Sequence, residues 1–140
     1  MVEKKMWDFL LWVYILNATL LINHEIDSSY WKEWNLISLL SGRSSNVNND
    51  QKNMNIFLLL HIPLIFLIMY GLKEIIQKSF IGLIISIVLC FGGFFAFFFH
   101  MHFIRKGRIE FNTPISKGMI AGIFILSIIQ LIITFLIIIS

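Results

Sequence analysis

The sequence predicts an all-α integral membrane protein, a four-helix bundle with a short amphipathic helix between its first and second helices. Of the 140 residues, 58% are hydrophobic and only 14% are charged, and the mean hydropathy is +0.83. The chain also contains four apolar stretches of about the 20 residues that a helix needs to cross a bilayer. Lipid offers the backbone no hydrogen-bond partners, so such stretches satisfy their own N–H and C=O groups as helices. This composition excludes soluble enzymes and secreted scaffolds, which need more polar surface.

The four predicted spans follow one another along a single membrane domain, residues 1–140. They cover approximately residues 6–23, 55–72, 80–104 and 119–139. Polar or charged segments separate them, and each span is too long and too continuously apolar for a strand of a membrane barrel. We therefore expect four helices that alternate in direction across the membrane.

The segment between the first two spans has an aromatic half followed by a wholly polar half. Aromatic and aliphatic side chains recur there at helical spacing, opposite polar ones: Tyr30, Trp31, Trp34 and Ile37 against Lys32, Glu33 and Asn35. This pattern is typical of an amphipathic helix lying in the membrane interface. On this interpretation Glu33 is a solvated charge at the level of the lipid headgroups.

The net charge of +3 comes from eleven Lys and Arg against eight Asp and Glu. The basic residues stand in short clusters at the ends of the apolar stretches, where they anchor helices to headgroups. No basic stripe interleaved with stacking aromatics is present to follow a nucleic-acid strand. We therefore expect the lipid bilayer as the main partner and no nucleic acid.

Small residues mark the helix faces that are expected to pack closely. Gly82 and Ser86 lie on one stripe of the third span, and Gly118 and Gly122 form a GxxxG at the start of the fourth. Small side chains let the backbones of membrane helices approach one another. These faces predict close packing inside the bundle, and they are also where a second copy or another membrane protein would bind.

All four histidines lie in or at the ends of predicted spans, where ionisable side chains are costly and usually functional. They are His24, His61, His100 and His102. Because successive spans alternate in direction, these positions place all four toward one membrane face. His100 shares a helix face with the small-residue stripe and points inward, whereas His102 is rotated from it by about 200° and points elsewhere.

The predicted metal site consists of His24, His61 and His100 together with Asp27. Neutral imidazole nitrogens and carboxylate oxygens are ligands of zinc and iron, and a helix bundle can direct them inward from facing helices. We expect a divalent transition metal, zinc or iron, bound by the three histidines. Asp27 would be a fourth ligand or would orient His24 through a hydrogen bond.

A catalytic base is predicted beside this site. Glu25 adjoins His24 and is placed to accept a proton from a metal-bound water, and Glu33 is an alternative base. No HExxH, CxxC or GxSxG motif is present, so the hypothesis depends on topology. The leading function is a metal-binding membrane protein that, as an enzyme, would act on a lipid-borne group at the membrane surface.

Two other functions are compatible with the same residues. His61 and His100 could serve as axial ligands of a b-type haem between the second and third spans, giving an electron-transfer protein. Alternatively, the chain is a non-catalytic structural, immunity or assembly protein, in which the histidines bond one another and nearby loop groups. Metal content and colour of the purified protein would separate these functions.

The first half of the chain contains a distinctive series of residues. Residues 24–27 read His-Glu-Ile-Asp, residues 33–34 read Glu-Trp, and residues 61–63 read His-Ile-Pro. In this pattern the chain resembles a family of small multi-pass bacterial membrane proteins of unknown function. The resemblance implies a small bundle in the cell membrane of a bacterium, and it implies no particular activity, cofactor or partner.

Overall fold

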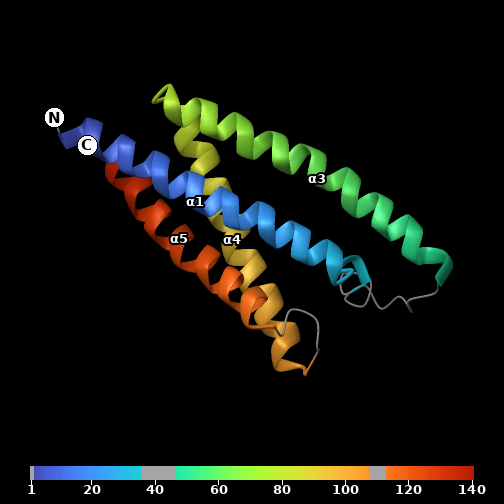
Figure 1. Cartoon of the computed structure of the whole chain (residues 1–140). Helices are drawn as coiled ribbons and strands as arrows, with labels where there is room; N and C mark the ends of the chain where they lie inside the picture. Colours follow the sequence, from blue (N-terminus) through green and yellow to red (C-terminus); the bar gives the residue numbers. More distant parts are fainter. Residues whose placement is uncertain (1, 36–46, 108–112) are drawn as a thin grey trace.

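The computed structural model describes residues 2–35, 47–107 and 113–140, which form four helices in these ranges (Figure 1). The helices are α1, Val2–Tyr30; α3, Val47–Ile76; α4, Phe80–Arg105; and α5, Pro114–Ile138. Each is long and apolar enough to cross a membrane. The predicted class, an all-α multi-pass membrane bundle, is confirmed. The end of the predicted amphipathic helix, residues 36 and 37, lies outside the described residues.

The helices do not end exactly where the predicted apolar spans end, and at α5 a cap determines where the helix starts. α5 begins at Pro114 instead of near residue 119. Its N-cap is Thr113, whose hydroxyl accepts a hydrogen bond from the backbone N–H of Ser116 at 3.1 Å. Proline at the first helical position suits this cap, because its missing N–H would have no intrahelical acceptor there.

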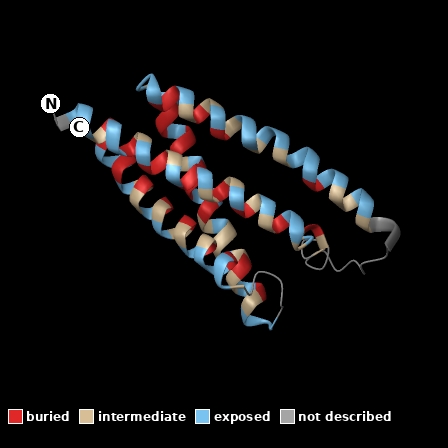
Figure 2. Cartoon of the chain, viewed as in Figure 1, coloured by how far each residue is buried: buried red, intermediate tan, exposed pale blue. Residues whose placement is uncertain are grey.

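Three of the helices pack closely, and α3 leans away from them. Figure 1 shows α1 and α5 side by side, with the two chain termini at the same end of the bundle. Of the apolar stretch of α3 only 17% is buried, compared with 39% in each of the other three helices. Figure 2 likewise shows α3 exposed along most of its length. The bundle is therefore a packed trio with one loosely attached helix.

α3 and α4 touch closely at the short turn that joins them. The hydroxyl of Ser79 caps α4 by accepting a hydrogen bond from the N–H of Ile81 at 3.1 Å. A Cβ at Gly82 would lie 2.8 Å from backbone atoms of Glu74 and Ile75, so this crossing requires glycine. From this contact the two helices diverge toward the opposite end of the molecule (Figure 1).

The small-residue faces are largely used inside the chain. Gly82 contacts α3, and the hydroxyl of Ser86 is hydrogen-bonded to that of Thr134 on α5 at 2.9 Å. A Cβ at Gly122 would meet the Leu20 side chain at 2.9 Å, whereas one at Gly118 would meet nothing within 4 Å in the described part of the chain. Close packing is thus observed at three of these four positions. Binding of a second copy or a membrane partner through them stays a prediction.

A cluster of neutral polar side chains, here called the central polar network, joins α1, α4 and α5 in mid-bundle. It consists of Asn17, Ser86, Ser127, Gln130 and Thr134, each at most 1% exposed. The Asn17 amide donates to Gln130 at 2.9 Å and to Ser127 at 3.2 Å. The Gln130 amide in turn donates to the Ser86 hydroxyl at 2.9 Å. These bonds hold the packed trio together within the apolar interior.

Candidate metal centre

Two of the predicted histidine ligands, His24 near the end of α1 and His100 near the end of α4, have their side chains in contact. Nε2 of His24 and Nε2 of His100 are 2.9 Å apart, and the rings meet edge to face with centroids 4.6 Å apart. Both side chains are buried, with 2% and 1% exposed. One neutral imidazole can therefore donate to the other, which leaves the pair uncharged in this apolar environment.

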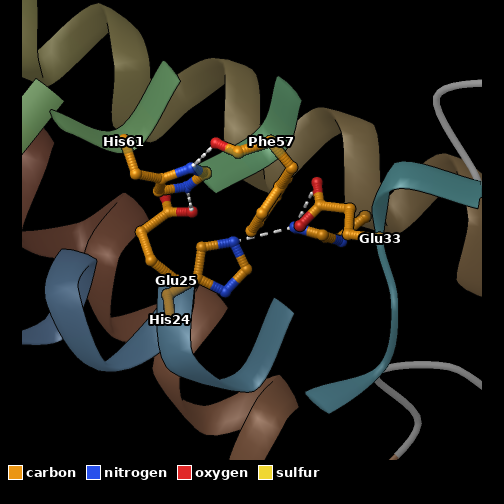
Figure 3. A network of polar contacts seen from close by, with 6 residues as sticks. His24, Glu25, Glu33, Phe57 and His61 are labelled. Carbon is orange, nitrogen blue, oxygen red and sulfur yellow. Dashed lines mark hydrogen bonds and ion pairs between the residues drawn. The ribbon is translucent and has the colours of Figure 1, made fainter. Parts of the chain in front are cut away.

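Glu33 completes a group of three ligand residues with these histidines. Its Oε1 lies 3.8 Å from Nε2 of His100, and its side chain is only 13% exposed. One ligand atom from each of His24, Glu33 and His100 lies within 4.8 Å of the other two. The interpretation of Glu33 as a solvated headgroup-level charge is therefore wrong, because its carboxylate points into the bundle (Figure 3).

The chain brings Glu33 into the site by reversing direction at the end of α1. The N–H of Glu33 donates to the carbonyl of Ser28 at 3.0 Å, and that of Lys32 to the carbonyl of Ser29 at 3.2 Å. These two bonds define a Schellman turn, which needs a left-handed residue. Lys32 takes this role with φ 54°, a conformation that costs a residue other than glycine about 1–2 kcal/mol. The reversal folds Glu33 back toward His100.

Both sequence neighbours of Glu33 are tied to one carboxylate at the start of α3. Nζ of Lys32 lies 3.0 Å from one oxygen of Asp50, and the indole N–H of Trp34 donates to the other at 2.5 Å. Trp34 is 6% exposed and its ring lies 5.5 Å from that of Phe57. Asp50 thus fixes the turn on either side of Glu33.

Glu25 and His61 form a second acidic and basic pair beside this group. Nε2 of His61 is hydrogen-bonded to Oε2 of Glu25, linking α1 and α3 (Figure 3). Nδ1 of His61 donates to the backbone carbonyl of Phe57 at 2.5 Å. A carbonyl can only accept, so this bond keeps a proton on Nδ1 and leaves Nε2 to share a proton with the carboxylate.

The remaining predicted residues lie outside the group of three. His61 is engaged with Glu25, so the structure separates it from the pair formed by His24 and His100. Asp27 is half-buried one helical turn after His24, and its buried Oδ2 has no hydrogen-bond partner among the described residues. Its role as a ligand or orienting residue stays a prediction. His102 is exposed, as its rotation on α4 predicts.

Burial gives the Glu33 carboxyl an unusual affinity for protons. Removal from water raises its pKa from 4.5 to about 7, opposed by the nearby Ser28 hydroxyl and reinforced by the charge of Glu25. At neutral pH, without a cation, this carboxyl is about half protonated. A metal ion would displace that proton and be stabilised by the resulting negative charge.

The family of the chain, though not its activity, follows from comparison with known proteins. No curated protein and no solved structure matches the chain. A family model does match, over residues 10–137, a range that includes all three residues of the ligand group. This match supports the expected kind of family and does not test the residue pattern on which the resemblance depended. The chain belongs to DUF6713, a family of unknown function.

Proposed function

We propose that this protein is a small membrane metalloprotein that binds one divalent transition metal, zinc or iron, between His24, Glu33 and His100. The observation that carries the proposal is the convergence of their three ligand atoms within 4.8 Å. Two histidines and one glutamate are a donor set that catalytic zinc sites use while keeping a fourth position open. The resemblance to bacterial proteins favours the cell membrane as the location.

The observed distances support a tetrahedral site. Ligand atoms bound to zinc at about 2.0–2.1 Å in a tetrahedron are roughly 3.3 Å from one another. The separation of 2.9 Å between the two Nε2 atoms and that of 3.8 Å between His100 and Glu33 lie on either side of this value. The ion would replace the hydrogen bond between His24 and His100 and move their Nε2 atoms apart.

Glu25 and His61 would accept and transfer protons beside the metal. A metal ion in such a site supplies a bound water of lowered pKa. Glu25 lies next to His24 in the chain and accepts protons as a carboxylate, and His61 shares the proton because the Phe57 carbonyl already occupies its Nδ1–H. Asp27 would remain as a further ligand or as a partner that orients His24. This arrangement suits metal-assisted hydrolysis.

Elemental analysis of the detergent-purified protein tests the proposal. We expect about one equivalent of zinc or iron in the wild type, and loss of the metal in His100→Ala and Glu33→Gln. His102→Ala is the matched control, since this exposed histidine on the same helix should not affect the metal. His61→Ala should also retain the metal, whereas a site built from three histidines would lose it.

Two results would overturn the proposal. One is a wild type that stays free of metal after incubation with zinc or iron, and the other is equal metal loss in His100→Ala and His102→Ala. An absorption spectrum of the same sample tests the haem alternative, which requires Nε2 of His61 to leave Glu25 and Nε2 of His100 to leave His24. A strong Soret band would favour haem.

A further inference from the structure

A pocket of about 290 Å³ between α1, α3 and α4 adjoins the candidate metal centre. Its polar lining residues are His24, Glu25 and Glu33, all of which belong to the site already described. Every other described lining residue is apolar, among them Leu64 and Leu67 of α3. Among the residues that the structure describes, the pocket is therefore polar only where it meets the candidate ligands and the proposed base.

The apolar part of the pocket extends from the site toward the middle of the membrane spans. On α4 the lining reaches Val88, twelve residues before His100 and thus roughly 18 Å along the helix axis. On α3 it continues three and six residues beyond His61, at Leu64 and Leu67. A molecule lying in it would have one end at the ligand group and the other among the apolar centres of the helices.

The pocket also communicates with the lipid-facing surface. Two of its lining residues on α4, Val88 and Phe95, are 50% and 70% exposed. Gly92, between them, is exposed too, and a Cβ there would meet no atom of the described residues within 4 Å. Leu64 and Leu67 of α3 line the same pocket, but no described atom of α3 lies within 4 Å of that Cβ position.

We infer that this pocket binds the hydrocarbon chain of a single-chain membrane amphiphile, which enters sideways from the bilayer and places its acid or ester group at His24 and Glu33. Its volume of about 290 Å³ is at the low end of the roughly 300–1,000 Å³ of typical ligand pockets, which favours one chain over two. A lipid in the bilayer has the same orientation, with its polar group at the surface. Only the placement of the polar group rests on the proposed function.

Photolabelling in a membrane tests this inference. Purified protein is incorporated in phosphatidylcholine vesicles that contain a trace of palmitic acid bearing a diazirine on its chain, illuminated, and digested for mass spectrometry. We expect labels concentrated on Leu64 and Leu67 of α3 and on residues 88–96 of α4. Gly92→Leu, which fills the open space, should reduce these labels to the level found on lipid-facing residues of α5.

Gly118→Leu is the matched control. Among residues 2–35, 47–107 and 113–140, a Cβ at Gly118 also meets nothing within 4 Å, and this residue on α5 does not line the pocket. Both substitutions replace an exposed helical glycine by a better helix former, so both variants should fold. Labelling in the pocket should be unchanged in Gly118→Leu.

Labels that are spread evenly over lipid-facing residues, or that are equal in the wild type and Gly92→Leu, would overturn the inference. So would labels concentrated on Leu58 and Ile65, which line a separate pocket beyond the pair of Glu25 and His61. Metal content of the same samples separates the two proposals. Labelling that depends on Gly92 in a protein without metal supports chain binding alone, and bound metal without such labelling supports the metal site alone.

Discussion

In the described part of this bundle, two clusters of buried polar side chains differ in chemistry and in surroundings. The central polar network consists of neutral amides and hydroxyls that bond to one another among the three packed helices. The candidate metal centre consists of imidazoles and carboxylates, includes the turn after α1, and adjoins an open pocket. The polar groups of the central polar network link helices to one another, whereas those of the candidate metal centre are available to a ligand.

Buried polar residues of a small membrane protein can thus have two different roles. Neutral groups that satisfy one another can be fully enclosed at little cost. Ionisable groups lose solvation free energy on burial, and a bound cation or proton can offset this cost. We therefore expect substitutions in the central polar network to change stability alone, and substitutions at the candidate metal centre to change ligand binding and pH dependence.

The largest expected effect is a gain in stability of the metal-free protein in Glu33→Gln. Folding raises the pKa of Glu33 from 4.5 to about 7, so its contribution to stability is greatest below pH 4.5 and is lost as the pH rises to about 7. Above pH 7 the buried, ionised Glu33 therefore lowers the free energy of unfolding by about 3 kcal/mol. Glutamine carries no charge, so the substitution removes this cost. Thermal unfolding in detergent should show the variant more stable than the wild type at pH 8 and equally stable at pH 4.5.

A constant difference between the two proteins across this pH range would contradict the prediction. The control is Glu3→Gln, which alters an exposed carboxylate at the far end of α1 and should show no such pH dependence. Added zinc should reverse the order at pH 8, since only the wild type keeps the third ligand.

Gln130→Leu should have the next largest effect, in the opposite direction. The leucine side chain has a similar size but loses three hydrogen bonds, two that Gln130 donates to Ser86 and one that it accepts from Asn17. At about 0.6 kcal/mol for each interhelical bond, the free energy of unfolding should fall by about 2 kcal/mol. Metal content, measured on the same preparation, should not change. Loss of metal would show that the two polar regions are coupled.

Asp50→Asn should have the smallest effect, and it acts on the metal from a distance. Asp50 is a positioning residue, because it binds Lys32 and Trp34 on either side of Glu33. Loss of such a support typically weakens metal binding by about tenfold or more. Zinc titration should show this weaker binding when Asp50→Asn is made in the wild type. The same substitution made in Glu33→Gln should cause no additional loss of zinc affinity. Asp8→Asn, an exposed change on α1, is the control.

Much of the fold could be predicted from the sequence, because apolar stretches of this length have only one way to satisfy their backbone in lipid. The inward direction of His100 also followed from the helix face that it shares with Ser86, and both residues are buried. Such inferences succeed because side chains within a helix have fixed relative directions.

The partners of Glu33 and His61 could not be predicted in the same way. Glu33 reaches the site through a left-handed residue, and such a residue is usually glycine or asparagine, so Lys32 gave no indication of a chain reversal. His61 pairs with Glu25 instead of the other histidines because of how α3 is placed against α1, and helical periodicity contains no information on that placement. Positions across an interface, or beyond a helix end, depend on tertiary packing.

The close contact at Gly82 has a mechanical consequence for the rest of the molecule. Because α3 and α4 touch there and diverge afterwards, a change of the angle between the two helices pivots about this glycine. Val88 and Gly92 lie roughly 9 and 15 Å further along the axis of α4. A tilt of a few degrees at Gly82 therefore changes the separation of α3 and α4 at these residues by an amount that grows with their distance from Gly82. A single methyl group added at position 82 would in this way change the width of the pocket from a distance.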